Sequence, residues 1–304
     1  MTAKTSDTAA GPALTAPARP GYGHLRRFLA DWLPASPLLA VIAVCLVAPL
    51  LVLVVQTFFV NGSFTLDLWT SVLGRPSNQE AIVTSLALAA TAAVLTFLIG
   101  SPVAWLISRM LPRGRAFWLG LLNVGANFGG IGIAFAYLAT LGAVGMVTLF
   151  LQGLGLPFEP PRSSSFAALL LAFLYTNVPL FVLLTIPAMG ILSDDWWEAA
   201  QTASATRFQF WRMVGVPVLL PFLAAGLLLI FTWSIGIYGI AYGLAGQSGG
   251  TAVRLITLQI GSVLSSDVLT GTNQAAVLSV VLLAIAGVSL FAYRRLMKRG
   301  LKWL

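Results

Sequence analysis

Charged residues are scarce in this chain. Of its 304 residues only 9% are Asp, Glu, Lys or Arg, while 58% are hydrophobic; a soluble globular domain carries about 25% charged residues. A soluble protein of this composition could not cover its surface with polar groups, so the composition predicts that a lipid bilayer is the solvent. The single cysteine, Cys45, lies inside an apolar run, which excludes an intrachain disulfide.

The residue patterns of common catalytic and cofactor sites are also missing. No GxxxxGK[ST] phosphate loop occurs, because none of the lysines (Lys4, Lys298 and Lys302) follows a suitable glycine. The only histidine, His24, lies in a basic stretch, and no cluster of His, Cys and carboxylates suggests a metal site. No base accompanies a candidate serine nucleophile. We therefore expect a chain that is not an enzyme and has no catalytic residue, metal or cofactor of its own.

Ionisable residues avoid the middle of the apolar runs. Glu80 and Asp267 lie close to the ends of two such runs, and no Asp, Glu, Lys or Arg lies at a run's centre. Ionisable groups at membrane depth are typical of proton relays, so their absence argues against proton coupling. Sodium coupling through backbone carbonyls stays open.

Six apolar stretches are long enough to cross a bilayer, which takes about 20 helical residues. The expected spans are residues 37–59, 81–107, 117–141, 166–191, 216–240 and 274–293. A shorter apolar segment, residues 143–156, is expected to be a re-entrant or interfacial helix or an extension of the third span. The expected fold is an all-α, polytopic membrane domain over residues 35–293.

Lys and Arg are distributed unequally between the connections. With both termini inside, fourteen of the 17 Lys and Arg residues lie on the cytoplasmic side, and only Arg75, Arg162 and Arg254 lie outside. Because cytoplasmic loops carry the excess of these residues, we expect a cytoplasmic tail and interfacial segment over residues 1–34 and a basic cytoplasmic C-terminus over residues 294–304. The same pattern indicates that the net charge of +8 reflects orientation in the membrane and not binding to nucleic acid. The first 20 residues lack the apolar core and cleavage site of a signal peptide.

The connection between the fourth and fifth spans differs from the others. It reads SDDWWEAAQTASATRFQFWRMVGVP over residues 193–217. Ser193 can cap a helix whose first turn holds two aspartates, which complement the helix dipole. Trp196, Ala200 and Ala203 are expected on one face of that helix, and a second short helix is expected near residues 208–213.

This loop resembles the cytoplasmic EAA loop in the permease subunits of binding-protein-dependent ABC importers. The family pattern is EAA, a glycine four positions after the last alanine, nine further residues, and then I-x-L-P. The residues at these positions are Glu198, Ala199, Ala200, Ser204, Val214, Val216 and Pro217. Ser204 is the one non-conservative departure, at the turn between the two helices, where serine adopts positive φ less readily than glycine. An ordinary amphipathic interfacial helix is the alternative interpretation.

The resemblance implies a type I importer transmembrane domain with its core over residues 80–293, in a bacterial inner membrane. In this family the loop forms a coupling helix that docks on an ATPase, so Glu198 would make the main electrostatic contact and Ala199 and Ala200 would allow close approach. The implied coupling set also contains Ser204, Ala205 and Pro217. The implied partners are ABC ATPase subunits that bind ATP and Mg, a second identical or homologous permease subunit, and an external solute-binding protein.

The substrate and the translocation path are less clearly marked. Residues 126–131, ANFGGI, resemble the subgroup that serves polyamines, iron, thiamine or phosphonates. Candidates for a path are Asn123, Asn127, Asn177, Trp233 and Tyr238, which line it or form interhelical hydrogen bonds. The pairs Gly125/Gly129 and Gly239/Gly243 are expected to pack helices closely, or to form a flexible pore segment. A stand-alone secondary transporter or channel and a membrane scaffold are the alternative functions.

Overall fold

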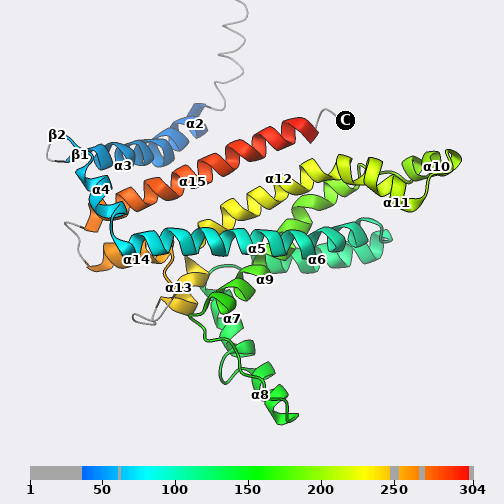
Figure 1. Cartoon of the computed structure of the whole chain (residues 1–304), viewed down its shortest axis with the longest axis horizontal. Helices are drawn as coiled ribbons and strands as arrows, with labels where there is room; N and C mark the ends of the chain where they lie inside the picture. The colour runs from blue at the N-terminus through cyan, green and yellow to red at the C-terminus, as the bar shows by residue number, and fades with distance from the viewer. Residues whose placement is uncertain (1–35, 61–62, 247–252, 267–270, 301–304) are drawn as a thin grey trace, which may run out of the picture. The chain divides into compact units, whose positions relative to one another are not determined.

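The computed structural model describes residues 36–60, 63–246, 253–266 and 271–300, which are almost entirely helical (Figure 1). Within them, six helical segments are long and apolar enough to cross a membrane. This confirms the expected all-α fold and the number of spans. The expected tail over residues 1–34, the end of the C-terminal segment after residue 300, and Asp267 lie outside the described residues.

The first candidate span, Ser36–Phe58, agrees with the expected residues 37–59. It consists of α2 (Ser36–Ile42), η1 (Ala43–Val47) and α3 (Ala48–Phe58) in direct succession. The middle segment is a π turn, in which the Ala48 N–H donates to the Ala43 carbonyl. The chain divides into two compact units between Val52 and Leu53, within α3.

After the end of α3, the second unit continues with a short hairpin and two helices. Strand β1 (Phe59–Val60) pairs antiparallel with β2 (Ser63–Phe64). Helix α4 (Asp67–Leu73) follows, and α5 (Pro76–Ser108) runs for 33 residues from a proline at its first position. Small residues dominate the buried positions of α5, which lets neighbouring helices approach closely.

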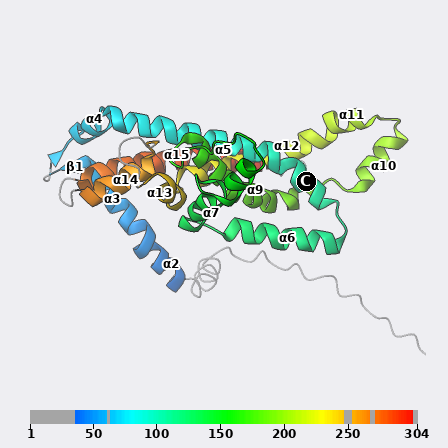
Figure 2. The same cartoon turned by 90° about the horizontal axis from the view of Figure 1, so that it is seen from below.

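Helices α5, α9 (Phe166–Met189), α12 (Val216–Ile235) and α15 (Gly271–Gly300) run alongside one another (Figures 1 and 2). The fully buried Phe181 of α9 fills the space left by two glycines. A Cβ at Gly100 of α5 would lie 2.5 Å from its ring, and a Cβ at Gly226 of α12 would lie 3.0 Å from it. This aromatic ring between two glycines therefore sets the approach of three helices.

The third expected span was wrong as a single helix over residues 117–141. Helix α6 (Pro112–Asn127) runs along α9, and α7 (Ile131–Leu141) takes another direction (Figures 1 and 2). The helix breaks because Gly130 has a φ of +67°. Helix α8 (Met146–Gly153) follows after a turn, and the third candidate span is Ile131–Gly153. By length and composition, the helical part of the apolar segment at residues 143–156 belongs to the third candidate span.

The fifth and sixth spans also differ at their ends from expectation. Helix α12 ends at Ile235 and not near residue 240, and α13 (Gly239–Ala245) begins after a short break. Helix α14 (Ile256–Ser266) precedes α15, which continues to residue 300. The described part of the basic C-terminal segment is therefore the end of a membrane-length helix.

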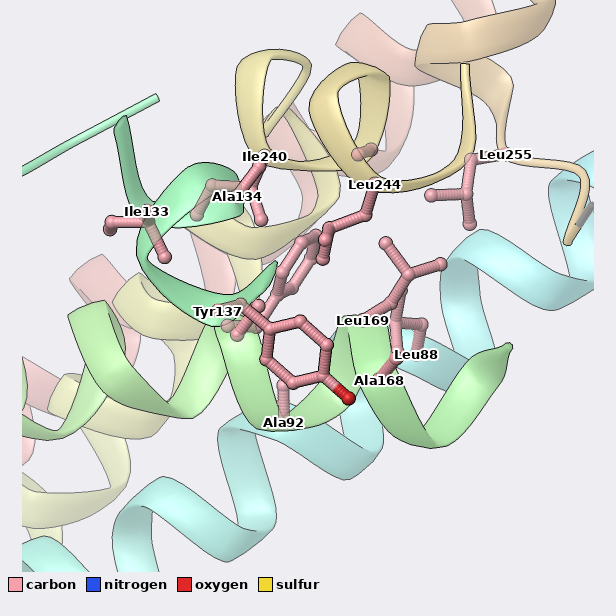
Figure 3. Close-up of a cluster of buried hydrophobic side chains, with 13 residues drawn as sticks. Leu88, Ala92, Ile133, Ala134, Tyr137, Ala168, Leu169, Ile240, Leu244 and Leu255 are labelled. Atoms are coloured by element: carbon pink, nitrogen blue, oxygen red, sulfur yellow. The ribbon is translucent and has the colours of Figure 1, made fainter. Parts of the chain in front are cut away.

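Two buried clusters lie at different places in the second unit. The first joins α5, α7, α9 and α13 and includes Leu88, Tyr137, Leu169 and Ile240 (Figure 3). The second joins the ends of α5, α9 and α12 next to α10 (Asp194–Thr202), α11 (Arg207–Phe210) and the π turn η2 (Trp211–Gly215). The loop singled out in the sequence therefore rests on its own hydrophobic cluster.

Candidate functional site

Helix α10 begins where the sequence predicts. Ser193 occupies the N-cap with extended backbone angles, and Asp194 and Asp195 lie in the first turn. The expected side-chain cap is not formed, because the Ser193 hydroxyl donates to the Asp195 carboxylate at 3.4 Å. The two acidic residues complement the helix dipole without that bond.

The outer face of α10 carries the residues that resemble the EAA motif. Glu198 and Ala199 are exposed, and within the described residues no ion pair reaches Glu198. The neighbouring Trp196 is 39% exposed. The Glu198 carboxylate is thus accessible to a partner, and the small side chain of Ala199 beside it allows that partner to approach closely.

The inner face of α10 packs on the bundle. Trp197 and Ala200 pack against the second buried cluster, whereas Trp196 and Ala203 are exposed. The Trp197 ring meets the Phe210 ring edge to face, with 5.4 Å between centroids. This aromatic contact turns Trp197 towards the bundle, and of the three residues expected on one face only Ala200 packs against the cluster.

Ser204 ends α10 in the backbone conformation that the family's glycine would favour. Its φ is 56°, the only positive φ of a residue other than glycine among the described residues. The Ser204 N–H donates to the Gln201 carbonyl at 2.9 Å, and the Ala205 N–H donates to the Ala200 carbonyl at 3.0 Å. These two bonds form a Schellman motif. The turn is therefore built with serine at a position that favours glycine.

The second helix of the loop is continuous with the fifth span. Thr206 begins α11 with a capping box to Gln209, and the helical run continues from Arg207 to Ile235. The short helix expected near residues 208–213 is therefore present as α11 and the η2 turn, and it runs on into the fifth span. Pro217 lies in the first turn of α12, just after the η2 turn. A proline ring inside a helix crowds the carbonyl of the preceding turn. The wider i to i−5 bonding of the π turn leaves more room for the ring there.

Arg109 at the end of α5 contacts the start of α10. One of its guanidinium nitrogens pairs with the Asp194 carboxylate, and the other donates to the Leu192 carbonyl at 2.7 Å. Its Cζ also lies 4.3 Å from the centroid of the Trp105 ring. The sequence signal for these contacts was weak: Arg109 was counted among the cytoplasmic charges, and no spacing rule pairs it with a residue 85 positions later.

A cavity of about 290 Å³ lies between these elements. Its lining combines the arginine, the loop and four aromatic rings: Trp105, Arg109, Ser193, Asp194, Trp197, Arg207, Phe210 and Trp211. The Trp105 and Trp211 rings meet edge to face at 4.7 Å between centroids. Aromatic side chains thus connect α5, α10 and the start of the fifth span. No group of His, Cys, Asp and Glu in the described residues could hold a metal ion.

The five candidate path residues do not share one environment. Asn177 is fully buried, and its amide donates to the Ser234 hydroxyl at 2.8 Å, which links α9 to α12. Its carbonyl oxygen has no hydrogen-bond partner. Of the two interpretations left open by the sequence, the structure shows an interhelical hydrogen bond at this position.

The other four candidates are exposed. Asn123 and Asn127 donate to carbonyls of their own helix, one turn earlier, at 2.9 Å each. Trp233 is 54% exposed and Tyr238 is 42% exposed. The Tyr238 ring stacks on Tyr242 with 5.3 Å between centroids. Asn177 is therefore buried between α9 and α12, whereas the other four candidates lie on exposed surfaces.

No protein-family model matches the chain. Among curated proteins, the sulfate transport system permease CysT of Salmonella typhimurium is 30% identical over 207 residues, which cover 67% of this chain and 72% of that protein. The molybdenum transport system permease ModB of Mycobacterium tuberculosis is 28% identical over 220 residues, covering 71% and 78%. The spermidine/putrescine permease PotB of Haemophilus influenzae is 26% identical over 259 residues, covering 82% and 87%. The named substrates differ, so the likeness concerns the transport machinery and not the cargo.

Solved structures show the same fold. A bacterial ABC transporter that imports the acidic polysaccharide alginate matches with a TM-score of 0.63 at 16% identity, covering 90% of this chain and 99% of that one. A bacterial alginate ABC transporter in complex with a periplasmic protein that holds an alginate pentasaccharide matches with a TM-score of 0.67 at 14% identity, covering 91% and 96%.

Proposed function

The chain belongs to the family of type I ABC importer permeases, and from this membership we propose that α10 is the helix through which an ATPase subunit drives its membrane helices. The exposed face of Glu198 and Ala199, opposite a face held by a buried aromatic cluster, is the observation that supports this role most directly. A partner that pushes on the outer face acts on a helix already packed on the bundle.

The proposed machine contains several chains. Two permease subunits, identical or homologous, enclose the path, since one such chain offers too few helices to do so. ATPase subunits bind ATP and Mg and receive one α10 each, and an external binding protein delivers the solute. ATP binding closes the ATPases, and the path alternates its opening as the helices move. The permease itself is a non-catalytic transport subunit without a cofactor.

We place the protein in the inner membrane as a multi-pass chain, with α10 and both termini in the cytoplasm. The ends of α5 and α15, the start of α6, and the α10–α11 segment lie at the same end of the second unit in both views (Figures 1 and 2). Arg109, Arg113, Arg115, Arg207 and Arg212 belong to these segments. A basic end of this kind faces the cytoplasm in most membrane proteins.

The experiment that tests the proposed function is purification of the tagged protein from its native cells in mild detergent, followed by mass spectrometry and reconstitution in liposomes. We expect a stoichiometric ATPase that carries a phosphate loop, and solute uptake that requires ATP and the external binding protein. A preparation without an ATPase that moves solute along an ion gradient would instead identify a stand-alone secondary transporter.

A further inference from the structure

Arg109 joins the end of α5 to the start of α10 through two contacts, and a third contact steadies its guanidinium on α5 itself. Its guanidinium reaches the Asp194 side chain, the Leu192 backbone carbonyl and the face of the Trp105 ring. Asp194 is the first residue of α10, and Leu192 lies in the turn that leads into it. Both the helix start and the preceding backbone are therefore bound to one side chain.

The geometry suits a guanidinium better than a lysine ammonium. Its planar fork donates in two directions at once and also stacks on an aromatic ring, whereas a lysine ammonium is a compact point charge on a flexible stem. Two of the donors are used in different ways here, one on a carboxylate and one on a backbone oxygen. The backbone contact fixes where α10 begins, whatever the conformation of the Asp194 side chain.

The surrounding aromatic rings strengthen the same connection. Trp105 of α5 contacts Trp211, and Trp211 contacts Phe210 with 6.2 Å between ring centroids. Phe210 in turn contacts Trp197 of α10. A continuous chain of side chains thus leads from α5 to α10 beside Arg109.

Helix α10 is joined covalently to only two membrane helices. The short turn before Ser193 links it to α9, and the Ser204 turn and α11 link it to α12. A force applied to α10 reaches α5 only through noncovalent contacts. Arg109 and the aromatic rings supply the direct contacts, and the packing of α5 along α9 and α12 supplies the indirect ones.

We propose that Arg109 is a positioning residue that makes α5 move together with the coupling helix α10, so that ATP-driven motion reaches a third membrane helix. This inference rests on the proposed function. Loss of the guanidinium leaves α10 on its aromatic cluster and able to bind an ATPase, but it lets α5 lag behind. Hydrolysis then continues with less solute moved per ATP.

The test measures the ratio of solute transported to ATP hydrolysed in liposomes that contain the complete complex. Arg109→Gln is expected to lower this ratio about fivefold or more, with the ATPase still bound at wild-type stoichiometry. Arg109→Lys retains the charge but loses the planar fork of donors, so its transport-to-hydrolysis ratio should lie between those of the wild type and Arg109→Gln. The matched control is Arg113→Gln, because Arg113 is exposed nearby and forms no ion pair within the described residues; its ratio should equal that of the wild type.

A second measurement replaces the Arg109–Asp194 contact by a covalent link that can be made at will. With Cys45 replaced by serine, Arg109→Cys and Asp194→Cys introduce the only two thiols. Before cross-linking, this double-cysteine variant is expected to transport as little solute per ATP as Arg109→Gln. A short thiol-reactive cross-linker between the two cysteines should restore the wild-type ratio. A cross-link that abolishes uptake would show that α5 and α10 must move apart, which contradicts the proposal.

The outcomes separate this inference from the proposed function. If the wild-type complex shows no ATP-driven uptake, the proposed function is wrong. If the wild type couples hydrolysis to uptake and Arg109→Gln retains the same ratio, only the role of Arg109 is wrong.

Discussion

Gly239 meets Gly130 backbone to backbone at the point where two helical runs break: a Cβ at residue 239 would lie 2.9 Å from the Cα of Gly130. Gly130 precedes α7, and Gly239 is the first residue of α13. One helical turn later, a Cβ at Gly243 would lie 2.4 Å from the Cβ of Ala134. The pair Gly239/Gly243 thus packs α13 closely on α7, as expected for small residues at this spacing.

We predict that Gly239→Ala destabilises the protein, because the added methyl group meets backbone that cannot rotate away. Overpacking of this kind costs about 1–3 kcal/mol, which should lower the thermal midpoint of the purified protein in detergent. The control is Gly120→Ala in α6, where no heavy atom lies within 4 Å of the added Cβ. That exchange replaces glycine by a better helix former and should leave the midpoint unchanged or higher. Equal midpoints for the two variants would contradict the close packing.

Replacement of Ser204 should stabilise or weaken the end of α10 according to the backbone preference of the new residue. Because Ser204 has a φ of 56°, Ser204→Gly removes a steric cost of about 1–2 kcal/mol, whereas Ser204→Val adds a β-branched side chain to the same conformation. We expect slower amide hydrogen exchange in α10 for the glycine variant and faster exchange for the valine variant. The reverse order would show that the Schellman turn does not hold the helix end.

Glu198 is predicted to contribute to ATPase binding and little to folding. Its carboxylate is exposed and forms no ion pair within the described residues, so Glu198→Ala should leave the thermal midpoint near that of the wild type. A hydrogen bond to a charged group contributes about 1.5–3 kcal/mol, which corresponds to roughly a tenfold to hundredfold weaker ATPase affinity on removal.

The control for this prediction is Glu159→Ala, which removes an exposed carboxylate outside the loop. Dissociation constants of the detergent-solubilised permease with its purified ATPase provide the comparison. Wild-type affinity and wild-type uptake in Glu198→Ala would show that this carboxylate is not the coupling contact.

Asn177 and Ser234 are predicted to be energetically coupled. Their side chains form the buried hydrogen bond between α9 and α12, and such bonds between membrane helices contribute about 0.6 kcal/mol on average. A double-mutant cycle of Asn177→Ala and Ser234→Ala, measured by unfolding in detergent, should return a coupling energy of that order. Asn123→Ala with Ser234→Ala is the additive control, because Asn123 bonds only within its own helix. A coupling energy of zero for the first pair would contradict the interhelical bond.

Much of the candidate site could be predicted because it depends on local sequence. The start of α10 at Ser193 follows from a capping residue and two aspartates, and the turn at Ser204 follows from the spacing after Ala200. The rotation of α10 about its axis could not be predicted. It depends on the contact between Trp197 and Phe210, which no helical period contains.

Composition and hydrophobic runs determined by themselves that the chain is a helical membrane protein with six membrane-length helices, because the bilayer demands long apolar segments with internally bonded backbone. Only the tertiary structure decided that the third run breaks at Gly130 and that Arg109 binds the start of α10. At the break, the backbone of Gly130 packs against Gly239. The acceptors of the Arg109 guanidinium lie 83 and 85 residues further along the chain. Such contacts depend on how distant segments come together in space, and hydropathy and local spacing carry no information about that.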